Sequence, residues 1–248
     1  MAEYETLKLK IEEGTATVTL NRPDKLNAID ETMMQELHQL FDELDTNQDI
    51  GVIVLRAEGR AFCAGMDLGW SEKQTKKDRV EQARMGQRIV EKMERTSIPV
   101  IAAVHGYALG GGLEFALGAD FMVAREDAQL GLPEITLSAK PPYRPKITEE
   151  GDPDQPEFGG NAPGWGSLSR LPERIGIARA KELVFTGARI DAKRAYEIGL
   201  VNDVYPEDEF DDQVAELGRR IGAMNRYNLR LAKELINKGY DWIEPHPS

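Results

Sequence analysis

The sequence predicts an α/β fold in which buried strands alternate with helices. Three short apolar runs, rich in β-branched residues, indicate buried strands at residues 51–57, 100–104 and 121–124. Helical patterns lie between them, and this alternation is typical of a sheet whose strands are joined by helical crossovers. The 248 residues are enough for one large domain, or for one domain with a helical extension.

A hairpin and a helix precede these strands. Residues 4–12 and 15–20 carry strand patterns, and Gly14 between them suits a hairpin turn. Asp30 is a good N-cap for a helix that extends to about residue 44, because the apolar residues that follow it recur at helical spacing.

The polar loop at residues 21–28 contains two basic side chains, Arg22 and Lys25, beside the rigid Pro23. This pair would suit a phosphate group. A turn stiffened by proline explains the same residues without any ligand, and from the loop alone we prefer this simpler interpretation.

Later parts of the chain carry more varied patterns. Residues 71–84 are so polar that we expect an exposed connection, which enters a helix ending near residue 96. We predict a tight turn at residues 129–134 and a long surface loop at residues 139–163, which are rich in proline, glycine and charge. Helices follow to about residue 240, with one short strand at residues 200–204, and the last residues are expected to fray.

Composition and charge exclude several classes of partner. Hydrophobic residues make up 41% of the chain and charged residues 30%, as in a globular protein with a core. The net charge of −12 argues against nucleic acid and anionic membranes as general partners. No apolar run reaches the length of a membrane span, and the first residues lack the pattern of a secretory signal, so we expect a cytoplasmic protein.

Cysteine and histidine are too sparse to predict a disulfide framework or a metal site. The single cysteine, Cys63, suits a reducing compartment, and three scattered histidines do not indicate structural zinc. No nearby residue would lower the pKa of Cys63, so we expect this thiol to pack rather than react.

The stretch from Gly106 to Glu134 is the part of the sequence best suited to chemistry. The run Gly110-Gly111-Gly112 separates a predicted strand from a helix, so free backbone N–H groups and the positive end of the helix meet at one place. Such a place binds an anion, which is either a phosphate or an oxyanion that develops during a reaction.

A second glycine junction favours the oxyanion. Residues 64–66, Ala-Gly-Met, follow another strand that we assign to the same sheet. If the two junctions are adjacent, each donates one N–H group to a single oxygen, and losing one such donor typically costs about 3 kcal/mol.

Two glutamates complete this arrangement. Glu114 lies near the start of the helix after the glycine run, and Glu134 lies on the predicted turn. Two carboxyl groups in a semi-buried pocket can divide the work of general base and general acid. Taken singly, each feature has a structural explanation, since a glycine run lets a helix start pack closely and Glu114 can pair with a surface lysine. Their joint occurrence favours acid–base chemistry.

These motifs together resemble the enoyl-CoA hydratase/isomerase (crotonase) family. The resemblance extends from about residue 7 to residue 240, and it rests on Leu20-Asn21-Arg22-Pro23 with Asn27-Ala28, Ala64 to Leu68, Pro99 to Glu114, Ala119-Asp120, Leu132-Pro133-Glu134 and Ala195 to Val201. It implies a crotonase-like spiral of ββα units in residues 1–177 and a C-terminal helical region, apparently shortened, in residues 178–248.

The resemblance also implies residue roles. The backbone N–H groups of Met66 and Gly111 would form the oxyanion hole, and Glu114 and Glu134 would add water across the 2,3 double bond of an enoyl-CoA thioester. The residues expected to bind this substrate are Lys25, Leu26, Ala64, Asp67, Leu68 and Gly110. Coenzyme A is part of the substrate, so no separate cofactor is expected, and relatives usually assemble as a trimer or a pair of trimers.

The sequence departs from the family pattern in two places, and both bear on which substrate the protein takes. The segment after Glu134 is expanded at residues 139–163, and Trp165 stands among the remaining glycines of that segment. The chain also stops soon after residue 240, where relatives usually continue. The alternatives to hydration are isomerisation, C–C cleavage or thioester hydrolysis of an acyl-CoA, or acyl-CoA binding without catalysis.

Overall fold

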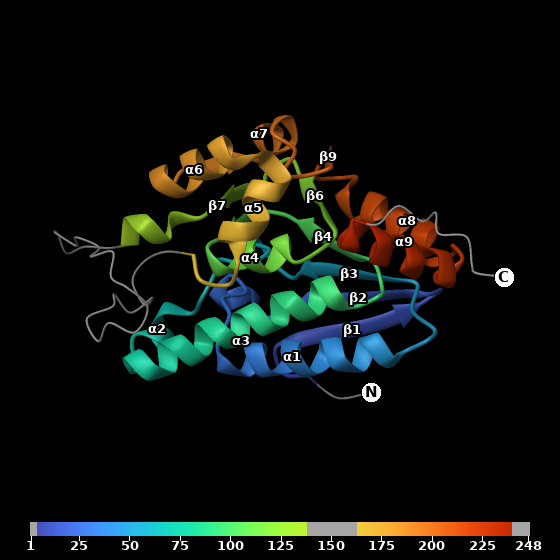
Figure 1. The fold of residues 1–248 in the computed structure, drawn as a ribbon, viewed down its shortest axis with the longest axis horizontal. Helices are drawn as coiled ribbons and strands as arrows, with labels where there is room; N and C mark the ends of the chain where they lie inside the picture. The colour runs from blue at the N-terminus through green and yellow to red at the C-terminus, as the bar shows by residue number, and fades with distance from the viewer. Residues whose placement is uncertain (1–3, 138–162, 240–248) are drawn as a thin grey trace.

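A six-stranded mixed sheet forms the centre of the molecule (Figure 1). The structure, a computed structural model, describes residues 4–137 and 163–239. The strands lie in the spatial order β1 (Leu7–Glu12), β2 (Thr15–Leu20), β3 (Val52–Ala57), β4 (Val100–Val104), β6 (Phe121–Arg125) and β9 (Asp203–Tyr205). β1 and β2 form the predicted antiparallel hairpin, and the other neighbours pair in parallel.

A second sheet has three short strands, β5 (Tyr107–Leu109), β7 (Gln129–Gly131) and β8 (Arg189–Asp191). β5 follows β4 along the chain and β7 follows β6, so the chain passes twice from the large sheet to the small one before it enters a helical segment. This repeated order of two strands and a helix is the unit expected from the resemblance.

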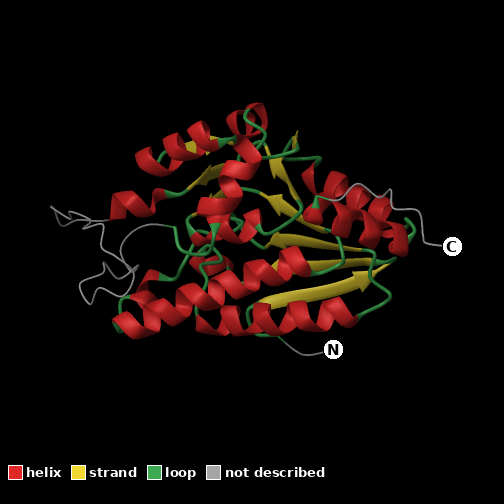
Figure 2. Cartoon of the chain, viewed as in Figure 1, coloured by secondary structure: helices red, strands yellow, loops and turns green. Residues whose placement is uncertain are grey.

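The large sheet has helices on both faces (Figures 1 and 2). Helices α1 (Glu31–Thr46), α3 (Lys76–Arg95) and α4 (Gly111–Leu117) cover one face, and α8 (Phe210–Gly222) covers the other. Successive residues of β4 point to opposite faces: Ala102 packs in the cluster under the first helices, and Ala103 packs with Phe210 of α8. The strand is buried on both sides because each face has its own helical cover.

The start of α1 confirms the predicted cap, since the Asp30 carboxylate accepts a hydrogen bond from the Met33 N–H at 3.0 Å. The remaining helical segments are η1 (Pro23–Lys25), α2 (Leu68–Ser71), η2 (Pro133–Leu137), α5 (Ser167–Ile175), α6 (Ile177–Thr186), α7 (Ala192–Glu197) and α9 (Arg226–Lys238). Among the described residues, no helix has the length and apolar character needed to cross a membrane.

Two expectations about local structure were wrong, and two others are not tested. The connection expected at residues 71–84 is mostly helix, because Thr75 and Asp78 form a capping box that starts α3 at Lys76. Residues 129–134 are not a turn: they form β7 and the beginning of η2, since Gln129 and its neighbours pair with β5 and β8. The loop predicted at residues 139–163 lies, apart from Pro163, outside the described residues, and the division at residue 177 stays a prediction.

Candidate functional site

The two glycine junctions are adjacent, but they do not follow strands of one sheet as the sequence suggested. The first follows β3 of the large sheet, whereas the second follows β5 of the small sheet. A single bridge joins them: the Cys63 N–H donates to the Tyr107 carbonyl at 2.8 Å, and the Leu109 N–H donates to the Cys63 carbonyl at 3.0 Å. The junctions meet because the chain after β3 pairs with β5.

Glycine is required where the two junctions touch. A Cβ atom on Gly112 would overlap the carbonyl oxygen of Cys63, so only glycine lets α4 start this close to the first junction. Gly65 has a φ of +103°, and its own Cβ atom would lie 3.5 Å from the backbone nitrogen of Gly111. These contacts bring the residues on either side of Gly65 next to the first turn of α4.

Two backbone donors at this contact have no acceptor among the described residues. The Ile29 N–H donates to the Gly65 carbonyl, and the Asp67 N–H donates to the Ile29 carbonyl. These bonds use the residues on either side of Met66, so the Met66 N–H itself has no acceptor in the described parts of the chain. The Gly111 N–H is left over because it is the first of α4 and has no carbonyl one turn back. Two free N–H groups on adjacent chain segments are the arrangement that an oxyanion hole requires.

Glu114 lies one turn into α4 with only 3% of its surface exposed. Its Oε1 atom accepts hydrogen bonds from the Trp165 N–H at 2.8 Å and from the Ser167 hydroxyl at 2.8 Å and N–H at 3.3 Å, and its Oε2 atom accepts one from the Gly164 N–H at 3.2 Å. Burial raises the pKa of Glu114, whereas these donors favour the charged form and oppose the rise. The surface ion pair considered as an alternative is therefore wrong.

Glu134 lies in η2, against the glycine run. Its Oε1 atom is 3.3 Å from the position that a Cβ atom on Gly110 would take, and its Oε2 atom is buried without a hydrogen-bond partner. Burial raises the pKa of Glu134 to about 7, and the negative charge of Glu114 adds to this rise. The two carboxyl groups therefore interact electrostatically, and the Glu134 carboxyl keeps its proton to a higher pH than an exposed glutamate does.

The indole of Trp165 forms a wall of this site. The side chain is 3% exposed, and the edge of its six-membered ring lies 3.5 Å from the position of a Cβ atom on Gly111. The same residue donates its backbone N–H to Glu114. Trp165 thus contacts both the oxyanion-hole segment and the buried carboxylate.

The residues expected to bind substrate surround the first junction. The Ala64 N–H donates to the Leu26 carbonyl at 3.0 Å, which attaches the η1 loop with Lys25 and Leu26 to the glycine loop. Lys25 is exposed, and Leu68 has 61% of its surface exposed although it is a large apolar residue. These groups are available to a ligand that reaches the free N–H of Met66.

Asp67 and Arg22 are already engaged within the protein. The Asp67 carboxylate caps α2 by accepting from the Trp70 N–H at 3.2 Å, and it also accepts from the Arg22 guanidinium at 3.2 Å. Arg22 pairs with Asp30 as well, at 2.8 Å. The loop at residues 21–28 therefore offers Lys25, but not Arg22, to a phosphate, which agrees with the structural interpretation of Arg22.

The Cys63 thiol is structural, as expected. It is fully buried at the bridge between the junctions, and burial raises its pKa to about 12. Within residues 4–137 and 163–239, no group of three His, Cys, Asp or Glu side chains could hold a metal ion.

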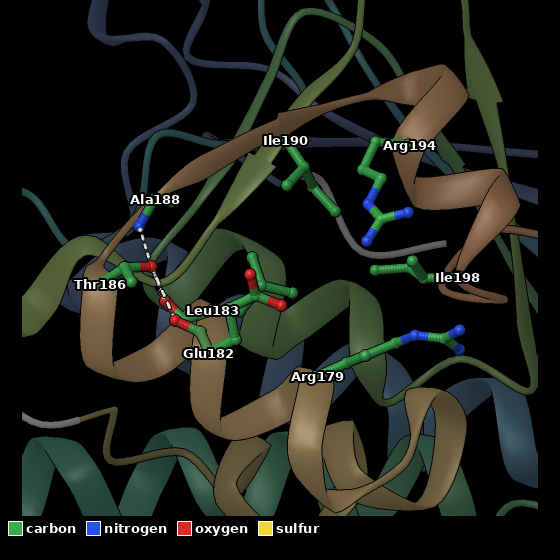
Figure 3. A pocket seen from close by; sticks show the side chains of 8 residues that line it. All are labelled: Arg179, Glu182, Leu183, Thr186, Ala188, Ile190, Arg194 and Ile198. Atoms are coloured by element: carbon green, nitrogen blue, oxygen red, sulfur yellow. Dashed lines mark hydrogen bonds between the residues drawn. The ribbon is translucent and has the colours of Figure 1, made fainter.

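A cavity of about 180 Å³ opens in another part of the molecule, between α6, β8 and α7 (Figure 3). Its lining includes Arg179, Leu183, Ile190 and Arg194, and neither glutamate of the site contributes to it. We therefore assign the acid–base site to the glycine junctions and not to this cavity.

Sequence reasoning missed two residues of the site. Ser167 gives Glu114 two of its donors, and Gly86 of α3 makes room for the Trp165 indole. Neither carries a local signal: Ser167 lies far along the chain from Glu114, and a single glycine within a helical pattern has many explanations.

The comparison with known proteins decides the family. A sequence profile of the enoyl-CoA hydratase/isomerase family matches residues 10–146 and 155–246. The chain belongs to this family. It is 37% identical over 230 residues to a putative enoyl-CoA hydratase/isomerase of Bacillus subtilis, covering 92% of this chain and 80% of that protein. It is 31% identical to a crotonyl-CoA hydratase of Syntrophomonas wolfei, covering 95% and 83%.

Solved structures of the family share the fold. The crystal structure of an enoyl-CoA hydratase from Bacillus anthracis matches with a TM-score of 0.84 and 32% identity, covering 95% of this chain and 83% of that chain. The predicted family and the predicted crotonase-like fold are both confirmed. The roles of individual site residues stay predictions.

Proposed function

We propose that the protein is an enoyl-CoA hydratase, which adds water across the 2,3 double bond of an acyl-CoA thioester. The observation that carries the proposal is the placement of Glu114 and Glu134 beside the two free N–H groups of Met66 and Gly111. The names of the relatives in Bacillus anthracis and Syntrophomonas wolfei support the same activity.

The thioester carbonyl oxygen accepts hydrogen bonds from the Met66 and Gly111 N–H groups. When a hydroxyl group adds to C3, the π electrons move toward the thioester and the oxygen gains charge as in an enolate. Donors that are already in place hold this charge without reorganising, which lowers the barrier. C2 then takes a proton, and the carbonyl re-forms.

The two glutamates have different roles because their surroundings differ. Glu114 is surrounded by four hydrogen-bond donors, so it works as the carboxylate that removes a proton from the attacking water. Glu134 has a pKa of about 7 and a buried oxygen without a partner, so it works as the acid that gives its proton to C2. Glu114 gains one proton from water and Glu134 gives one to carbon. Exchange of protons with solvent then returns both carboxyl groups to their starting states.

The coenzyme A phosphates of the substrate bind near Lys25. The reaction needs no metal or further cofactor, because two proton transfers and an oxyanion hole are sufficient.

We also propose that the protein assembles as a trimer or a pair of trimers, which light scattering measures. We propose a cytoplasmic location, which the free, buried thiol of Cys63 supports.

The test is an assay with a panel of 2-enoyl-CoA thioesters, in which loss of the conjugated absorbance and a mass gain of one water are followed together. Glu114→Gln and Glu134→Gln should each lower kcat about 100- to 10,000-fold. A product without added water would instead identify an isomerase. Absence of hydration for every substrate, with both variants equal to the wild type, would overturn the proposal.

A further inference from the structure

Several buried polar side-chain atoms have no hydrogen-bond partner in the part of the chain that the structure describes. Five such side-chain atoms occur in the described residues, and four of them belong to Trp70, Gln82 and Glu134. Buried polar groups almost always have a hydrogen-bond partner, and an unpaired one destabilises the folded state. The fifth atom, the Thr15 hydroxyl, lies against α8 on the other face of the sheet.

Gln82 is the most unusual of the three. It is 6% exposed, and both its amide oxygen and its amide nitrogen lack a partner. It occupies the first position of the buried face of α3, followed on that face by Gly86, Ile89 and Val90. An apolar side chain would fill this position at no polar cost.

The packing of α3 against α4 shows where Gln82 lies. A Cβ atom on Gly118, after the last turn of α4, would meet Val90 and Met93 of α3, whereas Gly111, at the first turn, is linked to Gly86 through the Trp165 indole. The two helices therefore run in the same direction. Gln82 lies one turn, about 5–6 Å, before Gly86, so it lies beyond the start of α4, on the side toward which the free Gly111 N–H points.

Trp70 lies on α2, four residues after Met66 and its free N–H group. This helix begins directly after Met66 and Asp67, and only residues 72–75 separate it from α3. The indole Nε1 atom of Trp70 is buried without a partner. Gln82 supplies two N–H groups and one carbonyl, and Trp70 supplies one N–H group. These two side chains therefore carry three donors and one acceptor that have no partner among the residues that the structure describes.

This inference rests on the proposed function. We propose that Gln82 and Trp70 bind an uncharged oxygen substituent on the acyl group, so that the preferred substrate is an enoyl-CoA with a hydroxyl or oxo group beyond C3. Three donors and one acceptor match such an oxygen. A carboxylate is the poorer match, because a buried charge needs a partner ion and neither Gln82 nor Trp70 carries a positive charge.

The experiment compares matched pairs of substrates that differ by one oxygen. kcat/KM is measured for but-2-enoyl-CoA against its 4-hydroxy form, and for hex-2-enoyl-CoA against its 4-, 5- and 6-hydroxy and 5-oxo forms. At least one oxygenated substrate should be preferred about 10-fold or more, since a site built to pair with an oxygen discriminates strongly against its absence.

Variants of Gln82 and Trp70 test whether these side chains cause the preference for the oxygenated substrate. Gln82→Leu should reduce the preference to less than a third of its wild-type value, and Trp70→Phe, which keeps a ring but removes the N–H, should reduce it as well. Gln35→Leu, at an exposed glutamine of α1, is the matched control and should leave the preference as in the wild type. Gln82→Leu should also raise the Tm of the free protein by about 2–4 °C, because it removes an unpaired buried amide.

Equal kcat/KM values within every pair, or the same preference in Gln82→Leu as in the wild type, would overturn this inference while leaving hydration intact. If no substrate is hydrated, the proposed function fails, and calorimetric binding of butanoyl-, hexanoyl- and matching hydroxyacyl-CoA decides the inference by itself. Tighter binding of a hydroxyacyl-CoA, lost in Gln82→Leu, supports it, and equal binding rejects it.

Discussion

The indole of Trp165 lies directly against the backbone of Gly86 on α3. A Cβ atom on Gly86 would overlap the shared edge of the two indole rings. Because the Trp165 N–H also donates to the Glu114 carboxylate at 2.8 Å, this one packing contact joins α3 to the proposed catalytic base. A substitution on α3 is therefore expected to act on Glu114 without touching it.

Gly86→Ala tests this link. Alanine normally stabilises a helix interior relative to glycine by about 1 kcal/mol, but here the methyl group displaces the indole, and overpacking costs about 1–3 kcal/mol. We expect a lower free energy of unfolding in urea, and a kcat lowered about 10- to 100-fold because the donor to Glu114 moves. Trp165→Ala provides the control: in that background the added methyl group should no longer destabilise. A gain of stability from Gly86→Ala alone would contradict the contact.

Ser167→Ala removes one charge-assisted hydrogen bond from Glu114. Such a bond contributes about 1.5–3 kcal/mol to the charged form, so its loss should raise the pKa of Glu114. Because the proposed base must be ionised, the acid side of the pH profile of kcat/KM should move to higher pH. Ser169→Ala is the matched control, since its hydroxyl caps a local carbonyl on the same helix. Equal profiles for the two variants would show that Ser167 does not tune Glu114.

Glu134 makes both activity and stability depend on pH. As the proposed acid it must be protonated, so kcat/KM should fall as pH rises through about 7. Its pKa in the folded protein lies above the ordinary value of 4.5, so the folded state binds the extra proton between these values and stability falls as pH rises from about 4.5 to about 7.

The variant Glu134→Gln isolates this effect. Relative to the variant, the wild type should lose about 1–3 kcal/mol of unfolding free energy between pH 5 and pH 8, because only the wild type then buries a charge. Denaturant titrations of both proteins at several pH values measure the difference. Parallel stability curves would mean that the Glu134 carboxyl ionises as an exposed glutamate does.

Elements with local sequence signals were predicted well. The Asp30 cap and the apolar spacing of α1 are visible within one segment, and β4 is a continuous run of buried residues. β7 was missed because three residues do not make a pattern, and it becomes a strand only through partners in β5 and β8 that are distant in the chain. Pairing between distant segments, rather than propensity, forms the small sheet.

The residues of the candidate site could also be predicted from local sequence signals, whereas their surroundings could not. Glycine runs and glutamates at family positions are visible in the sequence, so Met66, Gly111, Glu114 and Glu134 could be named from it. Their environment could not be named, because the donors to Glu114 come from residues 164–167, and the shift in the Glu134 pKa comes from burial by the whole fold. The residues that determine protonation are supplied by tertiary packing.

Lys25 should contribute to binding through the phosphates of coenzyme A alone. Its side chain is exposed on η1, in the loop that the Ala64–Leu26 hydrogen bond attaches to the glycine junction. Lys25→Ala should raise KM for an enoyl-CoA about 2- to 5-fold, and added salt should shrink the difference, since an exposed ion pair contributes at most about 1 kcal/mol. With an N-acetylcysteamine thioester, which lacks the phosphates, wild type and variant should have equal KM values. Lys10→Ala, an exposed lysine on β1, is the control. An equal loss with both thioesters would show that Lys25 acts on the fold of the loop and not on the phosphates.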